Sequence, residues 1–89
     1  MQLKRREALR GLRKLGTIEQ GGNHEKCRVI VDGKKIATFP IPSNDDYNDT
    51  LVHFVASPLC LDKHAFSDVC DCTKDKQWYR DHLAREGKL

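Results

Sequence analysis

Residues 21–41 read GGNHEKCRVIVDGKKIATFPI and predict the central hairpin of a β-sheet. Apolar residues occupy alternate positions of segment 25–31, which predicts a strand with one buried face. The inward positions are Cys27, Val29 and Val31, and the outward positions are Lys26, Arg28 and Ile30. Asp32-Gly33 is a strong signal for a two-residue hairpin turn. A second antiparallel strand is therefore expected over residues 34–41, with Pro40 at an edge or a strand end.

The segments before this stretch extend the pattern. Thr17 to Gln20 is expected to form a further strand, because Gly21-Gly22-Asn23 supplies residues that tolerate the positive φ of a tight turn. Residues 2–15 predict a helix, because their apolar members fall along one face at helical spacing. Those members are Leu3, Ala8, Leu9, Leu12 and Leu15. Gly16 follows as the expected left-handed C-terminal cap.

The segments after the hairpin predict helices, beyond a polar and acidic connection over residues 42–48. One helix is expected to start at a cap formed by Asp49-Thr50 and to end at Pro58. Its predicted buried stripe consists of Leu51, Val52, Phe54 and Val55. Asp62 is predicted to cap a short helix that buries Ala65, Phe66 and Val69, and Thr73 to cap a last helix that carries Trp78, Tyr79 and Leu83.

The predicted class is α+β: a helix, a three-stranded antiparallel sheet and a helix, with C-terminal helical additions. This is the arrangement of the double-stranded-RNA-binding-domain (dsRBD)-like folds, in which helices cover one face of a sheet. Residues 1–69 would form the domain, and residues 70–89 a helical extension packed on it. The chain of 89 residues suits one domain of this kind.

Charge and cysteine content narrow the function classes. Residues 1–38 hold ten Lys or Arg against four Asp or Glu, whereas residues 39–89 hold six against nine. A basic first half favours a polyanionic partner. No apolar run is long enough for a membrane span or resembles a signal peptide, so a cytoplasmic protein is expected. The spacing of Cys70 and Cys72 does not suit a zinc site, Cys27 and Cys60 are expected to be buried thiols, and no metal or cofactor is predicted.

Three stretches resemble the HicA family of toxins, which are small messenger-RNA-cleaving proteins of toxin–antitoxin pairs. The first is the helix ending over residues 12–16, and the second is Gly21-Gly22-Asn23-His24, where the family carries its catalytic histidine. The third runs from Thr50-Leu51 to Leu59-Cys60-Leu61-Asp62-Lys63-His64-Ala65-Phe66. Asn23 stands where the family most often has serine, the loop after Pro40 is more acidic than is usual, and residues 70–89 lie outside the resemblance.

The resemblance implies a metal-independent endoribonuclease with His24 as the general base, which would take the proton of a ribose 2′-hydroxyl. Gly22 and Asn23 would approach a phosphate closely, and Lys26 and Arg28 would stabilise the charge that builds on it. The basic helix would add RNA contacts through Arg6, Arg10 and Arg13. The implied partners are messenger RNA and an antitoxin of the HicB type.

Two other classes of function stay open. The same fold can bind RNA or a protein without cleaving anything, and Asn23 and the acidic loop favour that interpretation slightly. The chain can also be a phage or mobile-element accessory protein that acts on a host factor, with its acidic second half mimicking nucleic acid. A further partner that stays open is a second copy of the same chain, in a homo-oligomer. His53 is expected to be half-buried in its helix, and His64 and His82 to lie on the surface.

Overall fold

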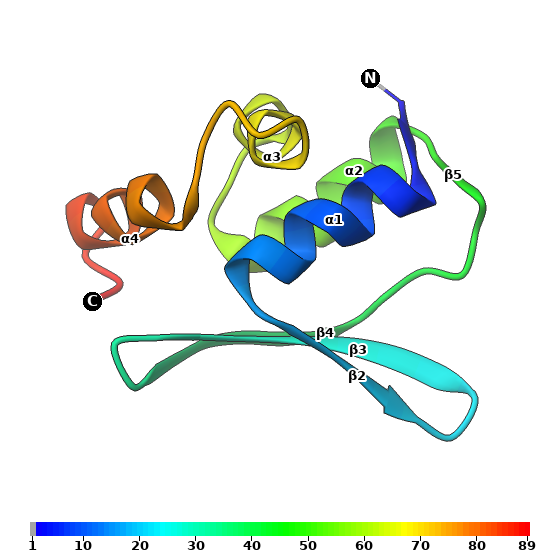
Figure 1. The fold of residues 1–89 in the computed structure, drawn as a ribbon, viewed down its shortest axis with the longest axis horizontal. Helices are drawn as coiled ribbons and strands as arrows, with labels where there is room; N and C mark the ends of the chain where they lie inside the picture. The colour runs from blue at the N-terminus through cyan, green and yellow to red at the C-terminus, as the bar shows by residue number, and fades with distance from the viewer. Residues whose placement is uncertain (1) are drawn as a thin grey trace.

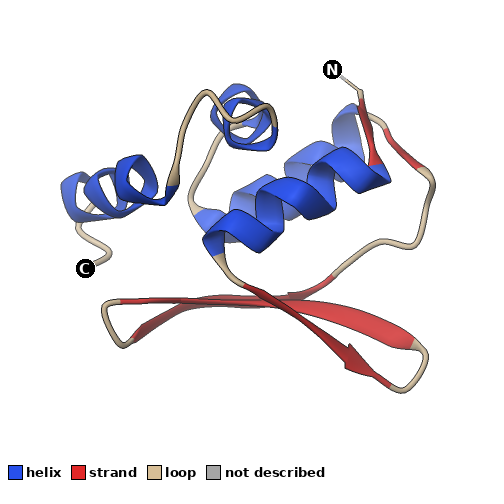
Figure 2. Ribbon diagram, viewed as in Figure 1, coloured by secondary structure: helices blue, strands red, loops and turns tan. Residues whose placement is uncertain are grey.

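The structure is a computed structural model that describes residues 2–89. Its elements are β1 (Leu3–Lys4), α1 (Arg5–Leu15), β2 (Thr17–Gly21), β3 (His24–Val31), β4 (Lys34–Pro40), β5 (Asp46–Tyr47), α2 (Asp49–Ala56), the 3-10 turn η1 (Ser57–Leu59), α3 (Lys63–Cys70) and α4 (Lys76–Arg85). The predicted α+β class is confirmed, with a three-stranded antiparallel sheet and four α-helices over the described residues. The helices lie on one side of the sheet and leave its other face uncovered (Figures 1 and 2).

The sheet has the strand order β2-β3-β4. Asp32 and Gly33 both have positive φ, at 53° and 77°. The pairing of Val31 with Lys34 confirms the predicted two-residue hairpin turn, and this pair of φ values is the pattern of a type I′ turn. The other hairpin turns through Gly22 and Asn23, because Gly21 already pairs with His24 across the strands. The inward side chains of β3 are buried against the helices, and the predicted alternation along this strand is confirmed.

The first helix starts later than predicted. Leu3 and Lys4 form β1, which pairs with Tyr47 and Asp46 of β5, and α1 begins only at Arg5. The prediction of a helix from residue 2 was therefore wrong at its start. The pairing joins segments about 40 residues apart, so the helical periodicity of the first segment carried no sign of it.

Gly16 was predicted to be a left-handed cap, and this was wrong. Its φ of −158° and ψ of −157° are extended, because the chain passes directly from α1 into β2. A Cβ atom at this position would lie 2.4 Å from the carbonyl oxygen of Arg28. Glycine is required here because α1 and β3 approach so closely, and not because of its backbone conformation.

The helix α2 differs from the prediction at its cap and on its outer face. Asn48 is the N-cap, and its side chain accepts a hydrogen bond of 2.9 Å from the backbone N–H of Leu51. Val52 and Val55 are buried as predicted, but Phe54 is 47% exposed and His53 is exposed as well. Successive helical residues are about 100° apart, so positions 53 and 54 turn away from the core that positions 52, 55 and 56 face.

The helix α3 matches its prediction more closely. Asp62 caps it by accepting a hydrogen bond of 2.7 Å from the backbone N–H of Ala65. Ala65, Phe66 and Val69 are buried as predicted. Helix α1 packs so closely on α3 that a Cβ atom at Gly11 would lie 2.5 Å from Cys70 Sγ.

The last helix is capped by Asp75, which accepts a hydrogen bond of 2.8 Å from the backbone N–H of Trp78, and not by Thr73. Tyr79 and Leu83 lie in the main core, and the Tyr79 hydroxyl donates a hydrogen bond of 2.9 Å to the carbonyl oxygen of Leu59. Trp78 is only half-buried.

The ring of Trp78 stacks on His82, with ring centroids 5.0 Å apart, and the ammonium of Lys74 lies 4.6 Å above the Trp78 ring. His82 was predicted to be a surface residue. It is half-buried, and its Nε2 makes a hydrogen bond of 2.7 Å with the carbonyl oxygen of Cys60. No helix over residues 2–89 is long and apolar enough to cross a membrane.

Candidate nucleic-acid interface

His24 is the first residue of β3, directly after the Gly22–Asn23 turn. Its side chain is exposed and makes no hydrogen bond or ion pair with any other residue that the structure describes. Gly22 has a φ of 63°, and a Cβ atom built there would meet no atom within 4 Å. Three residues, Gly21-Gly22-Asn23, were predicted to supply the positive φ of this turn, and Gly22 is the one that takes it. The imidazole and the turn backbone are therefore open to a ligand.

The uncovered face of the sheet brings His24 together with two cations of the same strand. Residues 24, 26 and 28 alternate with the buried positions of β3, so His24, Lys26 and Arg28 share the solvent face. Two residues of a strand span about 7 Å, which places Lys26 next to His24 and Arg28 one step further. The helices lie on the other side (Figure 1), so an extended chain can cross this face unobstructed.

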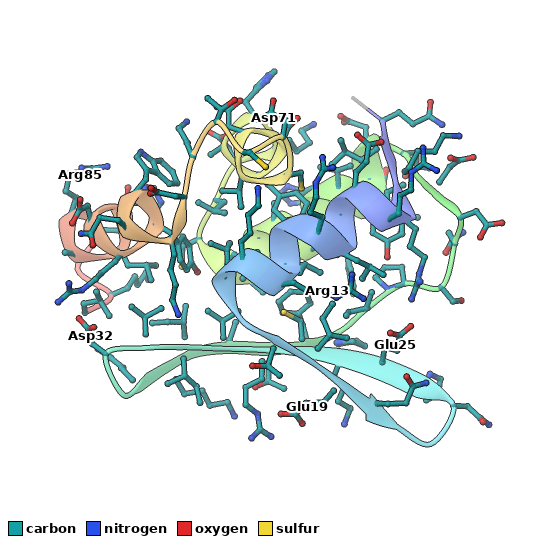
Figure 3. All side chains as sticks on the ribbon, in the orientation of Figure 1. Arg13, Glu19, Glu25, Asp32, Asp71 and Arg85 are labelled. Carbon is teal, nitrogen blue, oxygen red and sulfur yellow. The ribbon has the colours of Figure 1, made fainter. Side chains whose placement is uncertain are left out.

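The same face carries an acid that the sequence analysis did not identify. Glu19 of β2 pairs in register with Lys26, and its Oε1 lies 3.2 Å from Arg28 Nε. Figure 3 shows Glu19 on the open side of the sheet and Glu25 on the side of the helices. The side chains of Arg28 and Glu19 are 49% and 45% exposed, so their ion pair is weak. If the hairpin is built with a two-residue turn at Gly22–Asn23, Glu19 falls opposite Lys26 on the same face of the sheet, so the sequence alone could have identified it.

The start of β3, which carries His24, is fixed by contacts on the side of the sheet that faces the helices. Glu25 forms an ion pair with Arg5 of α1, and the backbone carbonyl of Glu25 accepts a hydrogen bond of 2.9 Å from Ile41 N–H. Arg5 Nε and the hydroxyl of Tyr47 both donate to the carbonyl oxygen of Pro42, at 3.3 and 2.6 Å. Burial raises the pKa of Tyr47, and Arg5 opposes this shift. These contacts fix the backbone that presents His24.

The three arginines predicted on the first helix do not act as one surface. Arg10 Nε donates a hydrogen bond of 2.8 Å to the carbonyl oxygen of Cys70, at the C-terminal end of α3, where a cation is favourable. Arg6 is exposed near the start of α1. Arg13 lines a pocket together with Arg28 of the sheet. The structure therefore joins Arg13 to the predicted site and leaves Arg6 and Arg10 apart from it.

Two of the four cysteines, Cys27 and Cys70, are poorly suited to act as nucleophiles. Cys27 and Cys70 are buried, and burial raises the pKa of these thiols from 9.0 to about 11 and about 12. Both are therefore protonated at neutral pH, and all four cysteines are free thiols. Cys60 was expected to be buried and is half-buried. Within the described part of the chain, no three His, Cys, Asp or Glu side chains are grouped so that they could hold a metal ion.

Comparison with protein-family models, with curated proteins and with solved structures finds no match for the chain. The chemistry of the site is accordingly argued from its own geometry. An exposed imidazole, two cations of the same strand and a glycine turn lie along one open sheet face. Such a face can bind a phosphodiester chain and can remove a proton from a group bound beside His24.

Proposed function

We propose that the protein binds single-stranded RNA across the uncovered face of the sheet and cleaves it with His24 as the general base. One observation carries the proposal: His24 is exposed at the end of β3, on the same face as Lys26 and Arg28. An endoribonuclease needs a base beside the ribose and cations beside the phosphate. This face offers both on one strand.

In the proposed reaction, His24 takes the proton of a ribose 2′-hydroxyl as that oxygen attacks the adjacent phosphorus. A 2′,3′-cyclic phosphate forms, and the bond to the 5′-oxygen of the next nucleotide breaks. That oxygen leaves with a proton from water. Histidine suits this step because a ring nitrogen of a neutral imidazole can accept a proton. Lys26 stabilises the negative charge on the phosphoryl oxygens, and Gly22 lets the turn backbone approach them.

The order of elements from α1 through β2, β3 and β4 to α2 supports a dsRBD-like fold as part of this proposal. The resemblance of residues 3–69 to HicA toxins supports the same reaction class. We accordingly propose messenger RNA as the substrate, a cytoplasmic site of action and an antitoxin of the HicB type as the protein partner. An antitoxin that covers the open sheet face would block RNA and His24 together.

The second candidate is a module that binds RNA without cleaving it. Glu19 favours this function over cleavage, because its carboxylate pairs with Arg28 and lies across from Lys26, the cations that would have to stabilise the reacting phosphate. An acid beside these cations opposes the extra negative charge that builds on the phosphoryl oxygens during cleavage. Among the described residues, no carboxylate makes a hydrogen bond or ion pair with the His24 side chain that would orient its ring.

The deciding experiment mixes the purified protein with a labelled single-stranded RNA and compares His24→Ala with His64→Ala. His64 is an exposed histidine of α3, so its replacement is a matched control. We expect the first variant to lose cleavage and keep its fold and RNA affinity, and the second to behave as the wild type. Wild-type binding without cleavage would establish the second candidate. Equal cleavage by the wild type and His24→Ala would refute the assignment of His24.

A further inference from the structure

A small basic pocket lies where α1 passes into β2, away from the turn that carries His24. Its volume is about 150 Å³. Its charged lining residues are all cations, namely Arg13, Lys14, Arg28 and Lys76, and the lining is completed by Leu15, Gly16, Thr17 and Ile30. No carboxylate lines this pocket, in contrast to the sheet face beside it.

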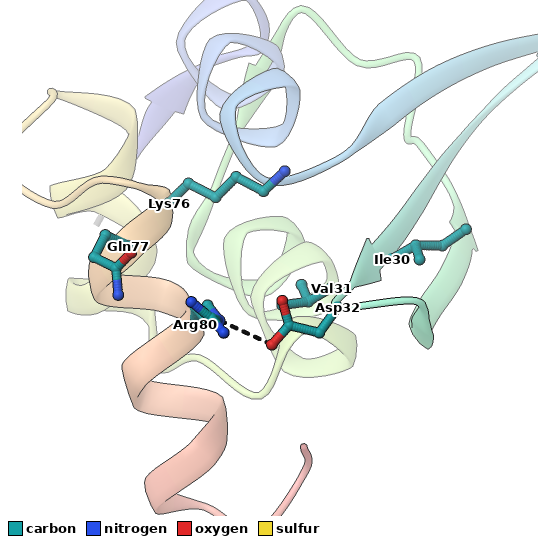
Figure 4. Close-up of a pocket in the computed structure, with 6 residues that line it drawn as sticks. All are labelled: Ile30, Val31, Asp32, Lys76, Gln77 and Arg80. Atoms are coloured by element: carbon teal, nitrogen blue, oxygen red, sulfur yellow. Dashed lines mark hydrogen bonds and ion pairs between the residues drawn. The ribbon is translucent and has the colours of Figure 1, made fainter.

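The cations converge from three separate elements. Arg13 comes from α1, Arg28 from β3 and Lys76 from α4. Figure 4 draws a neighbouring pocket that shares Ile30 and Lys76 with this one, and in it Lys76 extends from α4 towards the connection between α1 and β2. Arg80 of α4 forms an ion pair of 2.8 Å with Asp32 in the β3–β4 turn. Both side chains of this pair are about half-exposed, so the pair is weak, and it is the buried side chains of Tyr79 and Leu83 that hold α4, and with it Lys76, in place.

This convergence is electrostatically unfavourable without an anion, because like charges repel. The side chains of Arg13 and Lys76 make no hydrogen bond or ion pair with any residue among 2–89. Lys76 is also the first residue of α4, where the helix dipole disfavours a cation. Lys14 is held in place, because its Nζ donates a hydrogen bond of 2.8 Å to the carbonyl oxygen of Val69. Two cations of the pocket are therefore free to bind an anion.

We propose that this pocket binds one backbone phosphate of the RNA strand that crosses the sheet, an inference that rests on the proposed function. Pockets for whole small-molecule ligands measure about 300 Å³ or more, so a volume of about 150 Å³ suits a phosphate group and not a complete nucleotide. Arg28 can exchange its weak, half-exposed contact with Glu19 for a phosphate, which guanidinium groups bind in a bidentate manner.

The pocket binds a different phosphate from the one that reacts. Arg28 follows His24 by four residues of β3, which separates their Cα atoms by about 13 Å. A phosphate held at Arg13, Arg28 and Lys76 therefore sets the position and direction of the strand relative to His24. It also gives α4, which lies outside the resemblance to HicA toxins, a part in RNA binding through Lys76.

The test measures the binding of a short single-stranded RNA with 2′-O-methyl riboses, which His24 cannot cleave because the attacking hydroxyl is blocked. Lys76→Gln is compared with Arg85→Gln, which removes the same charge from an exposed position of the same helix. Lys76→Arg serves as the variant that keeps the charge. A second arm titrates inorganic phosphate and follows the backbone amide signals of Gly16 and Thr17 by NMR.

We expect Lys76→Gln to weaken RNA binding about tenfold at low salt. It should reduce the slope of log K against log salt by about 0.7, the value for one phosphate contact on a single strand. Arg85→Gln should leave that slope unchanged, and Lys76→Arg should restore it. The amide signals should shift with phosphate in the wild type and not in Lys76→Gln.

Equal slopes for Lys76→Gln and the wild type, or equal losses in Lys76→Gln and Arg85→Gln, would overturn the proposal. Phosphate-dependent shifts with an unchanged RNA slope would also overturn it, because the pocket would then bind a free phosphate and not the RNA strand. The result is separate from the cleavage proposal, since the methylated RNA is not a substrate. Cleavage that depends on His24 can be observed even if the pocket does not bind RNA, and the pocket can bind RNA even if the protein does not cleave it.

Discussion

Tyr79 should be the residue that anchors the C-terminal helix, although Trp78 beside it is larger. The side chain of Tyr79 is fully buried, and its hydroxyl donates to the carbonyl oxygen of Leu59. Trp78 is half-buried and is held by His82 and Lys74 at the surface of α4. Tyr79→Ala, Tyr79→Phe and Trp78→Ala separate these contributions.

The magnitudes follow from burial and from the hydrogen bond. Tyr79→Ala removes a fully buried aromatic ring and should lower the free energy of unfolding by about 3–5 kcal/mol. Tyr79→Phe keeps the ring but leaves the Leu59 carbonyl without its donor, which should cost about 1 kcal/mol, or about 4–8 °C in Tm for a domain of this size. Trp78→Ala loses one ring stack, one cation–π contact and the part of the ring that packs against the core, together about 2 kcal/mol.

The assay is denaturant unfolding followed by far-UV circular dichroism, because Trp78 is the only tryptophan and one variant removes its fluorescence. Midpoints are compared at a constant slope, so that a shift reports stability alone. We expect Tyr79→Ala to be the least stable variant by a clear margin. A loss in Trp78→Ala equal to or greater than that in Tyr79→Ala would refute the packing of α4. An unchanged Tyr79→Phe would refute the hydrogen bond.

Three further predictions concern the core and the surface. Gly16→Ala should destabilise the fold by about 1–3 kcal/mol, because its Cβ would lie 2.4 Å from a backbone carbonyl oxygen of β3. Gly21→Ala is the matched control, because its Cβ would meet no atom nearer than 4.0 Å, and it should be almost neutral when both variants are compared by thermal unfolding. Burial raises the pKa of Cys27 and Cys70 to about 11 and about 12, so their contribution to stability is complete below pH 9 and is lost as pH rises through these values. Unfolding midpoints should fall over that range, and less steeply in Cys27→Ala; an equal fall in this variant would contradict the assignment. His53→Ala should change the free energy of unfolding by no more than about 0.5 kcal/mol, because its side chain is exposed, and a larger loss would show that it packs.

The local signals of the sequence predicted the sheet. Asp32-Gly33 is the turn it was expected to be, and the alternation from Cys27 to Val31 matches the buried face of β3. Both are properties of adjacent residues, and the backbone geometry of turns and strands is set locally. The cap of α3 at Asp62 is local in the same way.

The errors in the predicted fold come from pairings between distant segments. Leu3 joins a strand because Tyr47 is available to pair with it, and no periodicity within residues 2–15 carries that information. Gly16 is extended because β3 lies directly beside it. The choice between Trp78 and Tyr79 depends on which side of α4 meets Leu59, and adjacent residues of a helix differ by about 100°.

The residues that β3 contributes to the candidate site were predicted from the sequence, but Glu19 and Lys76, their neighbours from other elements, were not. His24, Lys26 and Arg28 share a face because they alternate along one strand. Glu19 enters this face through the register of the hairpin, which depends on the length of the turn. Lys76 approaches Arg13 and Arg28 only because α4 folds back over the sheet edge, so the basic pocket becomes visible only in three dimensions.

The chemical groups at the RNA ends distinguish attack by the 2′-hydroxyl from other routes of RNA cleavage. Mass spectrometry of the products of a defined single-stranded RNA identifies the group on each new 3′ end. Attack by the 2′-hydroxyl with His24 as the base predicts a 2′,3′-cyclic phosphate in the wild-type reaction and no such product with His24→Ala. New 3′-hydroxyl ends with 5′-phosphates, or a cyclic phosphate formed equally well by His24→Ala, would contradict the proposed reaction.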